Sequence, residues 1–333
     1  MAGAYEADLG SKTLDKASAI FRAFSSRMHF VTGLPVGKRL KDVLAMWQVD
    51  AEGNAYDPAV AEGIDATDTP DSTQPKPLYA RAEIFRSKRW MVTETAQAVE
   101  QTDVASEIAK QKNRCREKFM LSLESALLSF QEAVATGTRK TRGLMQWALD
   151  TAQAVDPVDA ALRPTSAMRH TGTLALLTVG AFQNMLAASR GQLRTRPVLT
   201  GKVGITLKRH MTTWGKIVAV ADGEAALQRY NVNASEKKLW EMIDFFEFDA
   251  GSVRAMTTDF LACDTTTLAE TDYTPRSGIF YVPERVRMRY LRPIQDRKQV
   301  NEGAGERGYI EGEGALIVDS PQGFLTVHTA LDS

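Results

Sequence analysis

The chain has 333 residues, of which 44% are hydrophobic and 25% are charged, the composition of an ordinary folded protein. Lys plus Arg (41) equals Asp plus Glu (41), so no net field draws the chain to nucleic acid or to an anionic membrane. The longest apolar run, around residues 174–179, is far too short to span a bilayer, and the first ten residues lack the basic and apolar segments of a secretory signal.

The first fifty residues read as an arm rather than a domain, with a short helical stretch over 13–28 and a turn at TGLPVGKR. The next segment, residues 50–77, is acidic, contains four prolines and has almost no large apolar side chains. Such a segment cannot bury enough surface to fold alone. A structureless loop of this length inside a compact domain indicates a special role, and the alternative is a disordered linker between domains.

Residues 78–99, LYARAEIFRSKRWMVTETAQAV, have the composition of a strand, with polar and apolar positions partly alternating. Together with the acidic segment they predict an extended, two-stranded projection. A lone ribbon is marginally stable in water, so we expect it to lie on something else.

The strongest helical pattern runs from about Thr102 to Ala135, where Thr102 or Asp103 can cap the first turn. Apolar residues recur at spacings of three, four and seven, and no Pro or Gly interrupts them before Gly137. A helix of this length would measure about 50 Å. It carries a basic run, Lys110, Lys112, Arg114, Arg116 and Lys118. These residues advance two at a time and so fan around the helix, which favours a solvated face over a nucleic-acid site.

From residue 173 onward the pattern becomes mixed helix and strand. We expect a helix over 173–191 closed by Gly191, a strand and turn over 196–207, and a helix over 235–246 capped by Ser235. Residues 251–264 and 277–294 read as strands. In the last of these, Arg285, Arg287 and Arg289 alternate with apolar residues, so period two places the three arginines on one face.

The stretch GAGERG, residues 303–308, has the spelling of a dinucleotide-binding turn, G-x-G-x-x-G. Such a turn needs an apolar strand before it and a helix N-terminus after it. Here the preceding residues, QDRKQVNE, are polar, and a strand-like run follows. The stretch is therefore predicted to be a flexible loop between two antiparallel strands.

No other motif predicts catalysis, a cofactor or a metal, and we expect no enzyme. The four histidines are scattered without metal-ligand spacing, and Asp65, Asp68 and Asp71 do not match a calcium loop. Cys115 and Cys263 lie far apart, outside any C-x-x-C, and are expected to be free thiols.

The order of these parts resembles that in the major capsid proteins of tailed phages, which have the Hong Kong 97-type fold. The parts are an arm, a projecting loop, a long helix, an α/β region and a returning hairpin. Five local motifs carry the resemblance: MWQVDAEGNAYDPAVAEGIDA, VTETAQAV, EIAKQKNRCREKFMLSLESALLS, TRGLMQW, and YLRPI followed by GYIEGEGALIVDSPQGFLTVHTAL. The stretch FEFDAGSVRAM departs from the sequence motif that the family usually has before the corresponding strand.

The resemblance implies an α+β protein in five parts. These are an N-terminal arm (1–49), an E-loop with flanking strands (50–98), a peripheral (P) domain with a long spine helix (99–172), an axial (A) domain (173–284), and P-domain return strands with a hairpin loop (285–333). It implies a structural subunit that assembles with itself into hexamers and pentamers of an icosahedral virion shell around double-stranded DNA. Assembly would take place in the host cytoplasm, with portal and scaffolding or cement proteins as partners and with no membrane and no cofactor.

On this basis the candidate inter-subunit contacts are residues of the loop, the arginine face and the hairpin tip: Asp65, Asp68, Lys76, Arg81, Arg285, Arg287, Arg289, Glu302, Gly303, Gly305 and Arg307. Two other hypotheses remain open. A DNA-binding or other non-enzymatic assembly protein would bind DNA in a salt-dependent way as a monomer. An enzyme with an unrecognised site would show a pocket with convergent polar groups.

Overall fold

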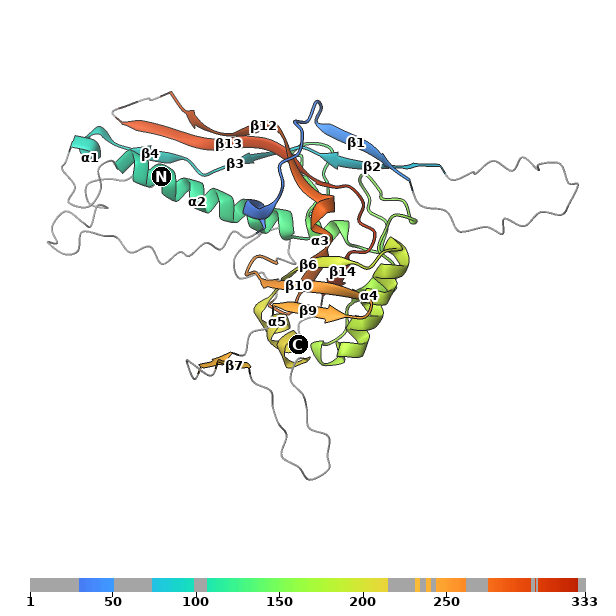
Figure 1. Cartoon of the computed structure of the whole chain (residues 1–333). Helices are drawn as coiled ribbons and strands as arrows, with labels where there is room; N and C mark the ends of the chain where they lie inside the picture. Colours follow the sequence, from blue (N-terminus) through green and yellow to red (C-terminus); the bar gives the residue numbers. More distant parts are fainter. Residues whose placement is uncertain are drawn as a thin grey trace, which may run out of the picture.

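The computed structural model describes residues 30–50, 74–98, 107–214, 231–233, 238–240, 244–261, 275–300, 303 and 305–328. These residues form a long layer of strands and one helix, joined to a smaller α/β unit (Figure 1). Within the described ranges no helix has the length and apolar character needed to cross a bilayer.

The long layer is an antiparallel sheet that joins distant parts of the sequence. Its centre is β13 (Glu306–Val318), which pairs with β12 (Val286–Lys298) on one side and with β3 (Glu83–Arg86) and β4 (Trp90–Val92) on the other. The predicted hairpin around GAGERG is thereby confirmed, since β12 and β13 run antiparallel on either side of it. Gly308 is already part of β13, opposite Lys298.

The predicted long helix is α2 (Glu107–Leu128), and it lies along this sheet (Figure 1). Its apolar stripe, including Phe119, Leu123 and Leu127, is buried in the main core, as the three- and four-residue spacing predicts. A short helix, α1 (Glu94–Ala98), precedes it, and α3 (Leu144–Trp147) follows it.

The predicted end of this helix at Ala135 is wrong. The Ser129 hydroxyl donates to the Ala126 carbonyl and accepts the Gln131 N–H, and Val134 then bridges back to Lys140, so the chain has turned. At 1.5 Å per residue the 22 residues of α2 measure about 33 Å rather than 50 Å. Residues 102–106 lie outside the described ranges.

The root of the projecting loop is a ribbon of β1 (Leu44–Val49) and β2 (Lys76–Arg81), in which Val49 pairs with Lys76. Residues 51–73, the acidic tip, lie outside the described ranges. The root packs on the subunit's own core: Leu78 and Ala80 are buried, and the Trp47 indole donates to the Asp319 carbonyl at 3.0 Å.

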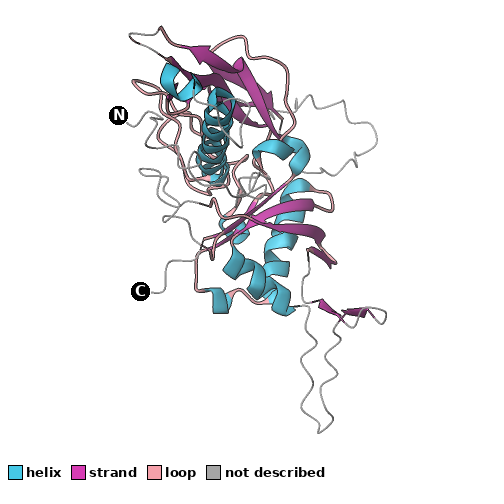
Figure 2. Cartoon of the chain, turned by 90° about the vertical axis from the view of Figure 1, so that its left-hand side faces the viewer, coloured by secondary structure: helices cyan, strands magenta, loops and turns pink. Residues whose placement is uncertain are grey.

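The smaller unit contains a six-stranded mixed sheet in the order β5 (Arg169–His170), β14 (Leu325–Val327), β11 (Gly278–Tyr281), β6 (Val198–Val203), β10 (Gly251–Thr257) and β9 (Phe245–Phe248). Figure 2 shows helices gathered below these strands, and they include α4 (Val179–Leu193) and α5 (Ile205–Trp214). Phe182 of α4 and Met211 of α5 share a second core with Phe280 of β11.

The predicted helix over 235–246 is wrong where the structure describes it. β8 (Lys238–Trp240) pairs with β7 (Asn231–Asn233), and β9 pairs with β10. In β9 the side chain of Phe246 is buried while those of Phe245 and Glu247 are exposed, which is the period of a strand. The neighbouring strand β10 supplies the backbone hydrogen bonds that a helix would have made internally.

The predicted closure of α4 at Gly191 is also wrong. Thr178 caps the helix by accepting the N–H of Ala181, and the helix continues to Leu193. Arg194 ends it in the left-handed conformation, with φ at 54°. The expected turn after β6 is the beginning of α5.

Candidate functional site

The three arginines predicted on one strand face surround a hollow of about 520 Å³. Arg287 and Arg289 project from alternate positions of β12, and Arg285 precedes them in the 3-10 turn Pro283–Arg285. The other walls are the end of β1, with Asp50, and the end of β13, with Asp319. We call this feature the arginine hollow. Its lining includes Asp50, the last described residue before the segment 51–73.

Among the described residues its charges are only partly compensated. Arg287 forms an ion pair with Asp319, but its buried Nε has no hydrogen-bond partner among the described residues. The Arg289 guanidinium donates to the backbone carbonyl of Lys38 at 2.7 Å. Among the described residues the Arg285 guanidinium donates one long hydrogen bond, 3.4 Å to the Gln322 carbonyl; burial lowers its pKa, and the charges of Asp319 and Glu284 act to raise it. With Asp50 and Asp319 as the two carboxylates, the lining keeps an excess positive charge.

Two other predicted contact residues are used inside the subunit. Arg81 makes two bonds to the Asp156 carboxylate, Nε at 2.6 Å and Nη2 at 2.9 Å, and Lys76 lies 3.5 Å from Asp159. The first ion pair is largely buried. Both pairs therefore fix the root of the projecting loop to residues 150–160. Asp65, Asp68 and Glu302 lie outside the described residues.

The hairpin tip combines one open and one constrained glycine. A side chain at Gly303 would meet no atom within 4 Å, whereas Gly305 has φ at 135° and a Cβ there would lie 2.5 Å from the Val92 carbonyl oxygen. Arg307 folds back to donate to the Val300 carbonyl, and the Val300 side chain is 83% exposed. The tip thus presents Val300 and Gly303 outward.

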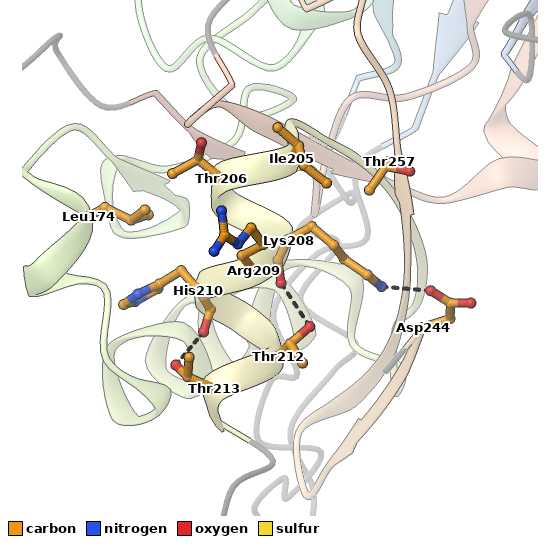
Figure 3. A pocket seen from close by; sticks show the side chains of 10 residues that line it. All are labelled: Leu174, Ile205, Thr206, Lys208, Arg209, His210, Thr212, Thr213, Asp244 and Thr257. Atoms are coloured by element: carbon orange, nitrogen blue, oxygen red, sulfur yellow. Dashed lines mark hydrogen bonds and ion pairs between the residues drawn. The ribbon is translucent and has the colours of Figure 1, made fainter. Parts of the chain in front are cut away.

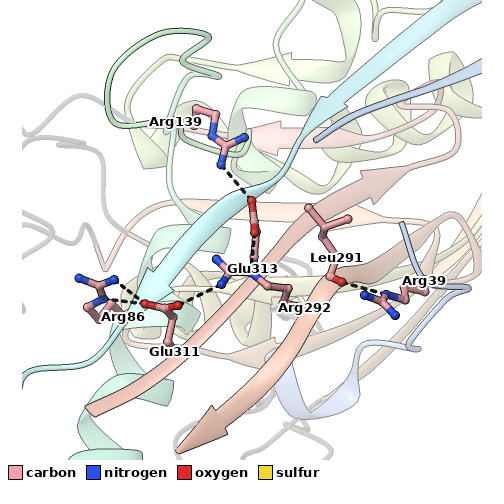
Figure 4. A network of polar contacts seen from close by, with 7 residues as sticks. All are labelled: Arg39, Arg86, Arg139, Leu291, Arg292, Glu311 and Glu313. Atoms are coloured by element: carbon pink, nitrogen blue, oxygen red, sulfur yellow. Dashed lines mark hydrogen bonds and ion pairs between the residues drawn. The ribbon is translucent and has the colours of Figure 1, made fainter. Parts of the chain in front are cut away.

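The sequence did not lead us to predict a network of Arg–Glu ion pairs on the long sheet (Figure 4). Glu311 and Glu313 are buried on one face of β13. Glu311 accepts from Arg86 at 2.5 Å and Arg292 at 3.3 Å, and Glu313 accepts from Arg292 at 2.8 Å and Arg139 at 2.9 Å. The alternation in GYIEGEGALIV was the available signal, because two charges at period two within an apolar strand must share one face.

The basic run on α2 fans around the helix as predicted. Lys112 turns to the sheet and lies 4.8 Å from the Trp90 ring centroid, and Lys110 pairs with Glu107 at 3.4 Å. Arg114, Arg116 and Lys118 are exposed.

A larger hollow, of about 710 Å³, lies beside α5 in the smaller unit (Figure 3). Several of its polar groups have partners within the subunit: Lys208 donates to Asp244 at 2.8 Å, the His210 ring contacts the Leu177 carbonyl at 2.8 Å, and the Thr212 and Thr213 hydroxyls donate to carbonyls of α5. Within the described ranges no group of three or more potential ligand side chains could hold a metal ion.

Comparison with known proteins places these features in a family. The sequence model of the family described as SU10 major capsid protein matches residues 4–330. No curated protein sequence was found to match. The fold is similar to the capsid of cyanophage P-SCSP1u, with a TM-score of 0.56 and 11% identity over 96% of this chain and 93% of that one. It is also similar to the capsid of a native GTA particle, with a TM-score of 0.57 and 11% identity over 98% of both chains. A chain of Microbacterium phage Oxtober96 matches with a TM-score of 0.56 and 12% identity, over 98% of this chain and 99% of that one.

Proposed function

The chain belongs to the SU10 major capsid protein family, and we propose that its copies form the hexamers and pentamers of a tailed-phage head that encloses double-stranded DNA. It is a major capsid protein with the Hong Kong 97-type fold, and its place is the shell of the virion. The observation that carries the assignment is the family match over nearly the whole chain. The proposal includes assembly in the host cytoplasm, portal and scaffolding or cement proteins as partners, and no enzymatic activity.

We assign the parts of the fold accordingly. Residues 1–49 are the N-terminal arm, 50–98 the E-loop with its strands, and 99–172 the P-domain with α2 as spine helix. Residues 173–284 are the A-domain, and 285–333 return to the P-domain. The shared layer of β3, β12 and β13 supports this division, because the return strands pair with the strand that follows the E-loop.

The charge distribution supports self-assembly. The described residues hold 34 of the 41 Lys and Arg residues but 21 of the 41 Asp and Glu residues, so they carry a net charge of +13. Residues 51–73 contain only acidic charges: Glu52, Asp57, Glu62, Asp65, Asp68 and Asp71. We therefore propose that the acidic E-loop of one subunit binds the arginine hollow of its neighbour, where guanidinium groups offer paired donors to carboxylates. Packaged DNA would meet other basic surfaces without sequence specificity.

Electron microscopy of the expressed chain tests the general proposal: shells, tubes or capsomers are expected, and a monomer that assembles in no buffer would contradict it. The arginine hollow is tested by R285E, because Arg285 has the weakest contacts within the subunit. We expect R285E to fold but to assemble poorly, and D65R/D68R to restore assembly in part. R116E, on the exposed side of α2, is the matched control. If R285E assembles as well as R116E, the hollow is not the docking site, whereas the capsid assignment stands.

A further inference from the structure

Glu124, in the last turn of α2, binds the root of the N-terminal arm. Its side chain is fully buried, and each carboxylate oxygen accepts one backbone N–H: Oε1 from Phe30 and Oε2 from Val31, both at 2.7 Å. These N–H groups begin the 3-10 turn Val31–Gly33, where no carbonyl of the turn can accept them. The carboxylate thus caps this turn from a distance of more than 90 residues in sequence.

The contact lies where the long layer meets the smaller unit. The buried Phe30 ring packs edge-on against Tyr281 of β11, with 5.9 Å between the ring centroids. Lys202 of β6 is only 2% exposed, and its closest described polar contact is the Met256 sulfur at 3.8 Å. Glu124 of the spine helix thus holds the arm root, and Phe30 of that root packs on the smaller sheet through Tyr281.

The electrostatics couple these parts. Burial lowers the pKa of Lys202, the negative charge of Glu124 acts to raise it, and Arg254 acts to lower it. Burial raises the pKa of Tyr281, and the charge of Glu124 adds to the effect. A buried carboxylate is tolerated only with hydrogen-bond donors and a nearby cation. Here the arm root donates two N–H groups to the Glu124 carboxylate, and Lys202 of the smaller unit supplies a positive charge that attracts it. Both interactions stabilise the ionised form of Glu124, so each favours the other.

We propose that Glu124 acts as a latch: it couples the binding of the arm root to the spine helix with the packing of the smaller sheet against the same helix. Coupling between two sites is reciprocal. A disturbance at Lys202 therefore loosens Phe30 and Val31, and release of the arm root loosens the sheet around β6. The latch acts within one subunit, and it fixes the direction in which the arm leaves before any neighbour is met.

Amide hydrogen exchange of the purified full-length chain tests the latch, with all variants compared in the same assembly state as checked by light scattering. In E124Q one amide oxygen remains but the facing NH₂ opposes the second N–H. We expect exchange at Phe30 and Val31 to rise by about tenfold or more, and exchange in β6 to rise with it. K202M, which does not touch the arm, should raise exchange at Phe30 and Val31 in the same direction. E117Q, on the same helix, is the control and should leave both regions at the wild-type rate.

Two results would overturn the proposal. Unchanged exchange at the arm root in E124Q would mean that the carboxylate does not hold it. A rise in E124Q without any rise in K202M would mean a local cap with no coupling. If E124Q loses its circular dichroism, E124D takes its place: it keeps the charge but shortens the side chain, and it should raise exchange at the arm root and, to a smaller extent, in β6. Failure of shell assembly would appear in micrographs and would leave these outcomes unaffected.

Discussion

Single residues decide how much of the shell surface is free for neighbours. Arg81, Lys76 and Arg287 each have a carboxylate partner inside the subunit, while the hydrogen bond of the Arg285 side chain to a described residue is to a carbonyl at 3.4 Å. Charge at a surface position is therefore a poor guide to docking, because an intramolecular partner can already occupy the side chain. This is why we rest the test of the arginine hollow on Arg285.

The buried carboxylates of β13 give a stability prediction. Glu313 is held by Arg292 and Arg139, and Gln in its place would remove the charge that both guanidinium groups face. We expect E313Q to lower the free energy of unfolding by about 1–2 kcal/mol, below the 3–5 kcal/mol of a fully buried pair because Arg292 is half exposed. E306Q, on the same strand, removes only the 3.6 Å pair with the exposed Lys298 and should change it by less than about 0.5 kcal/mol. Urea unfolding monitored by circular dichroism measures both, and equal effects would contradict the role of the network.

The two tip glycines should behave differently. G305V places a β-branched side chain at a positive φ and against the Val92 carbonyl, so we expect it to lower the melting temperature of the subunit. G303V meets no atom in the subunit and should leave that temperature unchanged. If the tip meets its counterparts where capsomers adjoin, as we predict, G303V nevertheless blocks shell closure. Normal shells from G303V would place the tip away from any neighbour.

His328 gives a pH prediction. Burial lowers the pKa of its imidazole below the ordinary 6.5, and the charge of Arg169 lowers it further. The unfolded chain therefore binds this proton more tightly, so the stability that the neutral ring contributes is present above pH 6.5 and is lost as the pH falls below it. We expect H328Q to flatten the decrease in melting temperature between about pH 6.5 and 5. An unchanged slope in H328Q would assign the acid sensitivity to other groups.

At the scale of elements, the spacing of apolar residues correctly predicted the helices and strands whose form depends on local sequence. The stripe on α2 and the alternation along β12 lead directly to a buried helix face and a strand pair. The helix predicted over 235–246 failed because the pairing of β9 with β10, not local spacing, decides that segment. Likewise, no pattern could show that Arg81 meets Asp156, 75 residues away, or that Glu124 meets the arm root. The arginine hollow was predicted as a face, but its walls come from β1 and β13.

The E-loop is the element whose removal best separates folding from assembly. Val49 and Lys76 are paired neighbours, so deleting residues 53–75 joins the strands by a three-residue connection, which a hairpin accepts. The deleted segment has almost no large apolar side chains with which to build a core. We expect circular dichroism and melting to change little, while assembly is abolished. Global unfolding of the deletion variant would mean that the segment belongs to the core.

At the scale of the whole molecule, a net charge of zero is the sum of +13 on the described residues and −13 on the rest of the chain. If complementary charge drives contact between subunits, salt should oppose it, because exposed charges are screened within about 10 Å at 0.1 M and about 3 Å at 1 M. We expect the yield of shells or capsomers from dissociated subunits to fall as NaCl is raised from 0.1 to about 1 M. Light scattering measures the yield, and a yield that rises with salt would indicate apolar contacts instead.

The long sheet also sets the order of events during synthesis. β3 leaves the ribosome early, yet its partner β13 follows more than 200 residues later, so β3 and the apolar stripe of α2 have no sheet to complete until the chain is nearly finished. At about 5–20 residues per second this interval lasts roughly 10–45 s. During that time the nascent P-domain exposes an unpaired strand edge and an apolar helix face while other copies are translated nearby. The subunit is thus most prone to aggregate before its last 30 residues emerge, and a chain truncated before Glu306 has no route to a closed P-domain.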